Sequence, residues 1–132
     1  KVIEEEKNNQ VKLSIKDVTI INDRAENIKN LKFDLVTARA VSNLPVLLEL
    51  CLPLTKVNGN FIAMKGSNYK EELCNANNAL KVLHGKVCNV IEYKLLNNEE
   101  KYGIHSLINI IKEKENSNSY PRAYALIKKK PL

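Results

Sequence analysis

Short runs of apolar residues divide the chain into candidate strands. Such runs lie at residues 18–21, 33–38 and 60–65. The run Phe33 to Ala38 (FDLVTA) is mostly apolar, which is typical of a central strand that is covered on both faces of a sheet. Two further β-rich segments, 86–95 and 104–111, are joined by a polar link and predict a terminal β-hairpin.

Helical spacing of apolar residues marks two other segments. In the first, Asn43 is a candidate N-cap and Pro45 falls in the first turn of a helix that ends near Cys51. Its apolar residues recur every three or four positions and predict one buried stripe. In the second, from Tyr69 to Leu83, the apolar positions again share one helical face, and Gly85 is expected to stop the helix.

The order of these elements predicts an α/β fold built on a parallel sheet. Strands alternate with helices before the hairpin, and right-handed crossovers place such helices on the faces of the sheet. Ligands of these sheets bind outside the carboxyl ends of the strands. Three places directly follow a predicted buried strand: Arg24 to Glu26, Arg39, and Lys65 with Gly66. We therefore expect Glu26, Arg39 and Lys65 to share one edge of the sheet.

Each of these three side chains has a functional and a structural interpretation. The guanidinium of Arg39 can bind a carboxylate with two parallel hydrogen bonds, or it can form an ordinary salt bridge with Glu26 or Asp34. Glu26 can accept from a ribose hydroxyl or an amine, or it can cap its own helical turn. Lys65 can face a ligand, or it can be a solvent-exposed lysine at a strand end.

Positive charge is concentrated at the C-terminus. The composition, with 44% hydrophobic and 27% charged residues, is that of an ordinary globular protein, and the net charge is +6. The segment from Tyr120 to Leu132 contains no acid, and its cations are Arg122, Lys128, Lys129 and Lys130. Such a block suits phosphates of nucleic acid, and the alternative is a solvated tail. With the polar stretch before it, we expect residues 113–132 to form a mobile basic tail.

Several classes of protein are excluded by what the sequence lacks. No run approaches the roughly 18 apolar residues that cross a bilayer, so no membrane partner is expected. Three widely spaced cysteines, an odd number in apolar surroundings, are typical of buried reduced thiols in a cytoplasmic protein. Neither histidine has a cysteine or acidic partner at metal-ligand spacing, so no metal is expected. No serine–histidine–acid group or Walker loop is present, which argues against hydrolysis and phosphoryl transfer.

Motifs spread over essentially the whole chain carry a family resemblance. They are FDLVTARAVSNLPVLLELCLPL (Phe33 to Leu54), GNFIAMKG (Gly59 to Gly66), and YPR with KKPL (Tyr120 to Arg122 and Lys129 to Leu132). In this order and spacing they resemble the bacterial small-subunit (16S) ribosomal RNA guanine-N7 methyltransferase family, RsmG or GidB. The run Asp23 to Glu26 is similar to the arginine–alanine–glutamate step after the third strand of that family.

The resemblance implies a Rossmann-like class I methyltransferase fold that depends on S-adenosylmethionine, incomplete at its N-terminus and ending in a β-hairpin. Residues 1–132 would be the C-terminal part of a single such domain. By the family's pattern, Ala25 and Glu26 would contact the methyl donor and Arg39 would line its pocket. The residues near the RNA-facing side would be Lys65, Tyr120, Arg122, Lys128, Lys129 and Lys130. The implied partner is ribosomal RNA or the small ribosomal subunit, and the complete protein is expected to be a monomer.

Two departures from the family pattern limit what this chain is expected to do alone. The glycine-rich donor loop of the family lies upstream of the helix whose end is predicted at residues 1–8, so the chain alone is expected to be inactive. The tail reads AYALI between Arg122 and Lys128, where the family usually has a glycine and a proline. Guanine N7 already carries a free lone pair, which agrees with the missing catalytic base.

Two other functions stay open at this point. One is a non-catalytic RNA-binding or ribosome-associated module that keeps a methyltransferase-like half-fold. The other is a methyltransferase-like structural fragment without an RNA role. A strand followed by a glycine-rich loop, encoded upstream of Lys1, would favour the enzyme.

Overall fold

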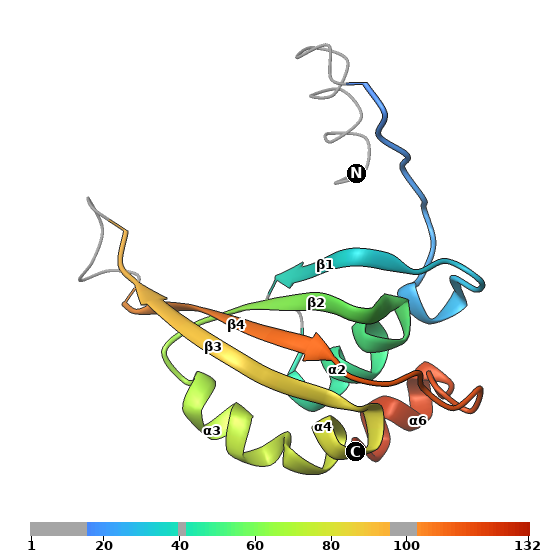
Figure 1. Cartoon of the computed structure of the whole chain (residues 1–132). Helices are drawn as coiled ribbons and strands as arrows, with labels where there is room; N and C mark the ends of the chain where they lie inside the picture. Colours follow the sequence, from blue (N-terminus) through green and yellow to red (C-terminus); the bar gives the residue numbers. More distant parts are fainter. Residues whose placement is uncertain (1–15, 40–41, 96–102) are drawn as a thin grey trace.

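Strands and helices alternate along most of the chain in a computed structural model that describes residues 16–39, 42–95 and 103–132 (Figure 1). The helix predicted at residues 1–8 lies outside these ranges. The elements are the 3-10 turn η1 (Ala25–Asn27), strand β1 (Phe33–Arg39), helix α2 (Leu44–Cys51), the 3-10 turn η2 (Leu52–Leu54), strand β2 (Thr55–Lys65), helices α3 (Tyr69–Asn75) and α4 (Asn77–Leu83), strands β3 (Gly85–Tyr93) and β4 (His105–Lys112), and helix α6 (Tyr124–Lys129).

The four strands form one mixed sheet in the order β1-β2-β4-β3. Strands β1 and β2 are parallel, as expected for strands joined through helix α2. Strand β4 inserts between β2 and β3 and runs antiparallel to both. The predicted terminal hairpin is therefore confirmed as β3 and β4. Its second strand, β4, also pairs with β2 and so joins the hairpin to the parallel pair.

Strand β1 is not the covered central strand that its apolar run predicts. It pairs only with β2 among the described residues, so it lies at the edge of this sheet. Phe33 and Leu35 are consequently 43% and 55% exposed. Residues 18–21, which were predicted to form another strand, are in no regular element. The apolar residues of β1 are those of a strand with a neighbour on each side, but among the described residues only β2 pairs with it.

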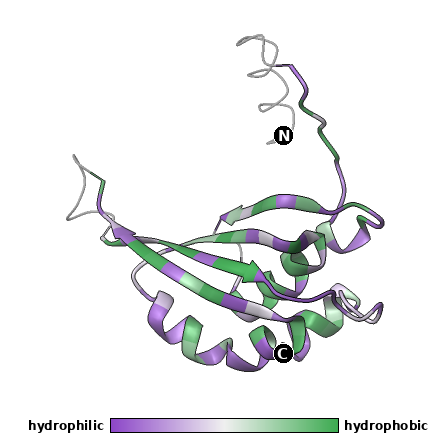
Figure 2. Cartoon of the chain, in the orientation of Figure 1, coloured by the Kyte–Doolittle hydropathy of each residue, from purple (hydrophilic) through white to green (hydrophobic). Residues whose placement is uncertain are grey.

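Helix α2 is buried on every side rather than along one stripe. Figure 2 colours the chain by hydropathy and shows this mostly hydrophobic helix beneath the sheet. Asn43 is its N-cap residue and Pro45 stands in its first turn, as predicted. The sheet covers one side of α2, while η1, α3, α4 and α6 contact the others. Glu49 is therefore fully buried together with its apolar neighbours. The centre of the core combines α2 with β2, β4 and the C-terminal helix: Leu44, Leu47, Leu48, Leu52, Phe61, Ile108, Ile110 and Ile127.

The second predicted helix covers the predicted range, Tyr69 to Leu83, but it is broken in the middle, and its stop residue is His84 rather than Gly85. Helix α3 gives way to α4 at Ala76, which is fully buried and has φ −97° and ψ 0°. His84, rather than Gly85, takes the left-handed conformation after α4, with φ 59°. Gly85 begins β3 instead, and a Cβ there would lie 2.9 Å from Leu52 Cδ1. Gly85 is thus suited to close packing rather than to a turn.

The C-terminal segment is folded onto the core, and the expectation of a mobile tail over residues 113–132 does not hold. Helix α6 follows the β-hairpin and buries Ile127 completely. The Asn78 side-chain amide donates to the carbonyl oxygen of Leu132 at 2.9 Å. The many polar residues around YALI led to the prediction of a mobile tail. In the structure, the apolar residues of YALI anchor the segment to the core.

The three cysteines are free thiols with different exposure. Cys51 is buried in α2, and this burial raises its pKa to about 12. Cys74 and Cys88 are exposed, although their apolar neighbours predicted burial. None of the described helices has the length and apolar character needed to span a bilayer.

Candidate functional site

Arg39 and Lys65 lie at the same edge of the sheet, as the strand pattern predicts. Arg39 ends β1 and pairs in register with Met64, the residue before Lys65 in β2. The Arg39 side chain is exposed. Neither of its candidate salt-bridge partners holds it, because Glu26 pairs with Arg24 at 2.5 Å and Asp34 pairs with Lys56 at 3.4 Å. A guanidinium at the carboxyl end of β1 is therefore available to a ligand.

Lys65 is part of the framework of this edge rather than an exposed lysine. Its side chain is 5% exposed, and its Nζ lies 2.8 Å from Glu72 Oε1. It also donates to the carbonyl oxygen of Ser42. Glu72 in turn accepts from the backbone N–H of Leu44 at 2.9 Å. These contacts tie the end of β2 to α3 and to the start of α2.

An open cavity of about 600 Å³ lies beside these residues. Its lining includes Ser42, Asn43, Lys65, Tyr124 and Lys128. The cavity thus joins the carboxyl end of β2 to the first and last turns of the C-terminal helix α6. In sheets of this kind, the carboxyl end is where ligands bind.

Ala25 and Glu26 are not brought to this edge. Their turn η1 precedes β1 and lies toward the opposite end of that strand from Arg39 (Figure 1). Ala25 lines a second cavity there, together with Lys32 and Lys112. The expected sharing of one edge by Glu26, Arg39 and Lys65 is therefore wrong for Glu26, because residues 18–21 do not form the strand that would have delivered it.

Arg24 connects this turn with the C-terminal helix. Its Nε pairs with Glu26, and its guanidinium carbon lies 4.1 Å from the centre of the Tyr124 ring. This is a cation–π contact, which favours the observed packing of α6 against η1. Asp23 accepts from Asn27 and from the Arg24 N–H, and these bonds lower the pKa of Asp23.

Arg122 is directed at a buried acid. Its Nη2 and Nε donate to Glu49 Oε1 at 2.6 and 3.1 Å, and its backbone N–H donates to Glu49 Oε2 at 2.8 Å. Hydrogen bonding to Glu49 raises the pKa of Arg122. Because Glu49 is fully buried, this pair fastens the C-terminal segment to α2. The guanidinium that was expected near RNA is occupied inside the fold.

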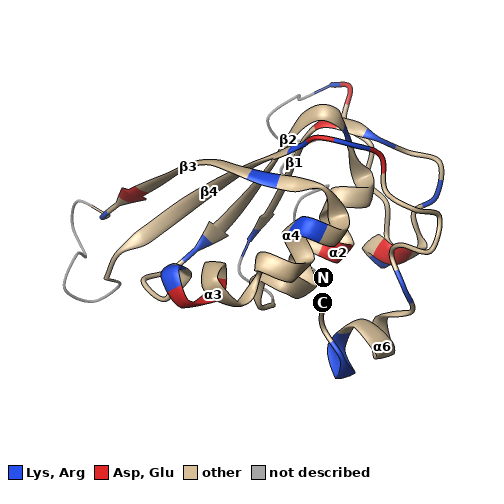
Figure 3. Ribbon diagram, turned by 60° about the horizontal axis from the view of Figure 1, so that its bottom comes forward, with Lys and Arg blue, Asp and Glu red and all other residues tan. Residues whose placement is uncertain are grey.

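The remaining basic residues of the segment are exposed. Lys128, Lys129 and Lys130 lie at the end of α6, and no acid stands in that helix (Figure 3). Tyr120 is partly buried and lines the second cavity, near η1 and Lys112. Of the residues expected to face RNA, the three terminal lysines are therefore the ones that are exposed and have no ion pair with another described residue.

Three residues that organise the molecule were missed from the sequence: Glu49, Glu72 and Lys112. Glu49 is the one acid within LPVLLELC, and an acid in so apolar a helix indicates a buried cation partner. Lys112 continues the buried phase of β4 after Ile108 and Ile110, a signal that the alternation of HSLINIIK contains. Glu72 has no comparable signal, since an acid in the first turn of a helix is common. Within the described residues, no three side chains are grouped to hold a metal ion.

Comparison with protein families assigns residues 7–100 to one model, described as rRNA small subunit methyltransferase G. Curated proteins carrying the name Ribosomal RNA small subunit methyltransferase G are similar over most of the chain. The protein of Clostridium beijerinckii is 40% identical over 126 residues, which are 92% of this chain and 52% of that protein. The protein of Oceanobacillus iheyensis is 43% identical over 126 residues, with the same coverage. The chain thus spans about half the length of these curated relatives.

Solved structures with low sequence identity show the fold. An rRNA methylase from Streptococcus thermophilus matches with a TM-score of 0.57 and 17% identity, over 85% of this chain and 68% of that one. The M1.HpyAVI–SAM complex matches with a TM-score of 0.56 and 17% identity, over 74% and 54%. The mixed sheet with its inserted antiparallel strand is thus that of a Rossmann-like class I methyltransferase.

Proposed function

Because the chain belongs to the rRNA small subunit methyltransferase G family, we propose that residues 1–132 are the C-terminal part of a single domain that methylates guanine N7 in small-subunit ribosomal RNA. S-adenosylmethionine is the proposed donor, and ribosomal RNA or the small ribosomal subunit is the proposed substrate. Among features of the structure, the available guanidinium of Arg39 at the carboxyl end of β1 supports this most directly.

Arg39 fits the carboxylate of an amino-acid-like donor. A planar guanidinium binds a carboxylate through two parallel hydrogen bonds, and neither Glu26 nor Asp34 competes for it here. The donor supplies an activated methyl group, and the residues of this chain have to orient donor and base. For Ala25 and Glu26, a donor contact is proposed on the family resemblance alone, since their turn lies toward the other end of β1.

The chemistry asks little of the protein beyond positioning. Guanine N7 has a free lone pair, so no side chain has to remove a proton before attack. Holding two reactants in line can lower a barrier by roughly 7–11 kcal/mol in favourable cases. Lys65 is engaged by Glu72 and Ser42, so we assign it to fixing the loop beside the cavity rather than to proton transfer.

The proposed RNA contact is carried by Lys128, Lys129 and Lys130. Lys128 and Lys129 lie in the last turn of α6 and Lys130 is its C-cap, and these exposed cations can neutralise phosphates. Arg122 contributes indirectly, because its bond with Glu49 holds the segment in place. Tyr120 stays a proposed contact near the second cavity.

Donor binding is tested with Arg39→Ala in a full-length protein that includes the glycine-rich loop. Loss of a charged hydrogen bond is worth about 1.5–3 kcal/mol, so the affinity for S-adenosylhomocysteine should fall about 10- to 100-fold. Arg39→Lys keeps the charge without the planar fork and should lie in between. Calorimetry measures both variants, with Lys81→Ala as a control on an exposed helical lysine. Unchanged affinity of Arg39→Ala would remove Arg39 from the donor pocket. The 132-residue chain by itself should bind the donor poorly.

RNA binding is tested through its salt dependence. Changing Lys128, Lys129 and Lys130 to Gln should reduce the slope of log affinity against log salt by up to about 2–3, since each phosphate contact contributes roughly 0.7–0.9. The matched control neutralises the same number of exposed lysines elsewhere, at Lys70, Lys81 and Lys86. Equal slopes for the two triple variants would show that the end of α6 is not the RNA contact.

A further inference from the structure

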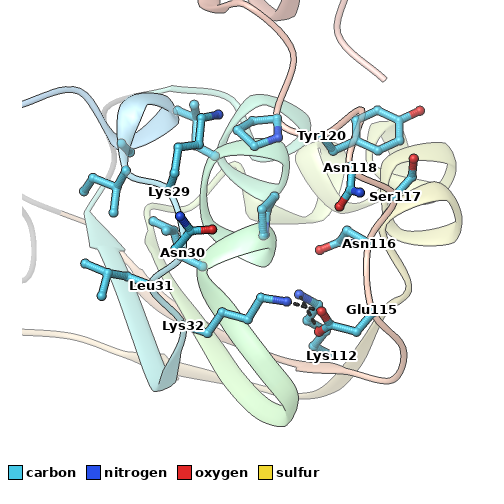
Figure 4. A pocket seen from close by; sticks show the side chains of 16 residues that line it. Lys29, Asn30, Leu31, Lys32, Lys112, Glu115, Asn116, Ser117, Asn118 and Tyr120 are labelled. Carbon is cyan, nitrogen blue, oxygen red and sulfur yellow. Dashed lines mark hydrogen bonds and ion pairs between the residues drawn. The ribbon is translucent and has the colours of Figure 1, made fainter.

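A second cavity, which we call the basal cavity, lies at the end of the sheet opposite Arg39 and Lys65. It has a volume of about 320 Å³ and is lined by the segment before β1, the end of α2 and the residues that follow β4 (Figure 4). Its polar lining includes Lys29, Lys32, Lys112, Glu115 and Asn116. Ala25 and Tyr120, for which donor and RNA contacts are proposed above, also line this cavity, but its polar residues have no part in those contacts.

Lys112 lines the basal cavity with unsatisfied hydrogen-bonding capacity. The residue is fully buried, and its Nζ has no hydrogen-bond partner among the described residues. The nearest acid is Glu115, whose Oε1 lies 3.6 Å away, too far for a good hydrogen bond. Glu115 also pairs with Lys32 through its other oxygen, so its charge is divided between two lysines. An ammonium group has three donors, and buried ones rarely go without acceptors.

Asn116 contributes an unused hydrogen-bond acceptor to the same cavity. Its side-chain Nδ2 donates to the carbonyl oxygen of Leu83 at 2.6 Å, which fixes the amide. Its Oδ1 is buried and accepts no hydrogen bond from the described residues. The lining of one cavity thus contains both an unused buried donor and an unused buried acceptor.

The charge of the lining selects the kind of ligand. Lys29, Lys32 and Lys112 against Glu115 leave two positive charges in excess, so an oxyanion is favoured. Lys112 and the two surface lysines can each donate to oxygen atoms of a phosphate. An adjoining hydroxyl group could in turn donate to Asn116 Oδ1. A phosphate carried on a sugar satisfies both requirements, whereas inorganic phosphate satisfies the first.

We propose that the basal cavity binds a ribose phosphate group, with the phosphate on Lys112, Lys29 and Lys32 and a sugar hydroxyl on Asn116. The group can come from a free nucleotide or from a nucleotide unit of RNA, and both present the same chemistry. Binding here needs no methyl donor, so it can be measured apart from methyl transfer.

Calorimetry of the 132-residue chain with ribose 5-phosphate tests the proposal. Ribose 5-phosphate should bind more tightly than inorganic phosphate, and ribose alone should not bind. Lys112→Met keeps the length of the buried side chain and removes the ammonium, so affinity should fall at least tenfold. Lys81→Met, which removes a lysine outside the cavity, should keep the wild-type affinity. Wild-type affinity in Lys112→Met, or no binding by the wild type, would overturn the proposal.

A second variant keeps the test decisive if Lys112→Met fails to fold. Lys29 and Lys32 are exposed, so changing both to Gln cannot leave a cavity in the core, and it should weaken ribose 5-phosphate binding severalfold. No loss in this variant would count against the cavity.

Competition by a single-stranded RNA oligonucleotide would identify RNA as the source of the group, and binding without competition would identify a free nucleotide. If the full-length protein transfers no methyl group but ribose 5-phosphate still binds, the proposed function is contradicted and the proposal for the basal cavity is not.

Discussion

Two buried lysines end strands of the sheet, at opposite ends of the molecule, and their surroundings differ. Lys65, at the carboxyl end of β2, has Glu72 at 2.8 Å and the Ser42 carbonyl oxygen as partners. Lys112, at the end of β4, has Glu115 at 3.6 Å and no hydrogen bond within the described chain. The partners differ as well, because the Glu72 side chain is 17% exposed and that of Glu115 is 55% exposed.

The difference shows that burial of a charge does not by itself mark a binding site. At Lys65 the protein supplies acceptors for the ammonium, so the charge organises the loop before α2. At Lys112 the protein supplies an ion pair without a hydrogen bond, so the ammonium can still gain an acceptor from a ligand. Substitutions of paired and unpaired charges should therefore have opposite effects on stability.

The largest loss is expected where a fully buried acid depends on one cation. Arg122→Met would leave Glu49 charged and without its guanidinium, which should lower the free energy of unfolding by about 3–5 kcal/mol. Chemical denaturation measures this. The double variant Arg122→Met and Glu49→Met should recover much of the loss. A loss below about 1 kcal/mol in the single variant would mean that the pair does not hold the C-terminal segment.

An intermediate loss is expected at Lys65. Lys65→Met removes the ammonium from a partly exposed Glu72, which keeps its hydrogen bond from Leu44, so about 2–3 kcal/mol should be lost. The same denaturation experiment measures it, and adding Glu72→Gln should restore part of the stability. If Lys65→Met is as stable as the wild type, the contrast with Lys112 disappears.

The smallest change, of opposite sign, is expected at Lys112. Lys112→Met removes an ammonium without acceptors and should raise stability at pH 7 by up to about 1 kcal/mol, or leave it unchanged. A loss above about 2 kcal/mol would show that Glu115 satisfies Lys112 after all.

The pH dependence of this difference carries a sign. Burial lowers the pKa of Lys112, against the opposing effect of Glu115. As pH rises toward 10.5, the ordinary value for lysine, the folded chain therefore loses this proton before the unfolded chain does. The unfolded state then binds more protons, and wild-type stability increases relative to Lys112→Met. Denaturation of both proteins between pH 7 and pH 10 measures their free energies of unfolding. The value for the wild type should rise relative to that for Lys112→Met as the pH increases. A difference that stays constant would contradict the lowered pKa of Lys112.

Local periodicity was enough to predict the elements that position Arg39 and Lys65. The apolar runs placed β1 and β2, the capping and proline signals placed α2, and the parallel pairing brought the two strand ends together. What failed depended on distant contacts. The edge position of β1 depends on which strands lie beside it, and the break at Ala76 depends on its complete burial.

The paired charges show the same limit within the candidate site. Arg122 and Glu49 are 73 residues apart, so the sequence gives no sign that they pair. All the cations of the C-terminal segment were therefore predicted to be free, although Arg122 is bound to Glu49. Lys65 looked exposed at a strand end because nothing in the sequence indicates that Glu72 lies beside it. Charge counts along a sequence show how many cations exist, whereas the fold determines which of them, such as Lys128 to Lys130, remain available.

The most direct test of the proposed methylation is mass mapping of small-subunit ribosomal RNA from cells with and without the intact gene. We expect one N7-methylguanosine to be lost on deletion of the gene. The wild-type gene should restore it, and a gene encoding Arg39→Ala should restore it less. If the methylated fragment is the same in both strains, the chain is not part of a guanine-N7 methyltransferase acting on this RNA.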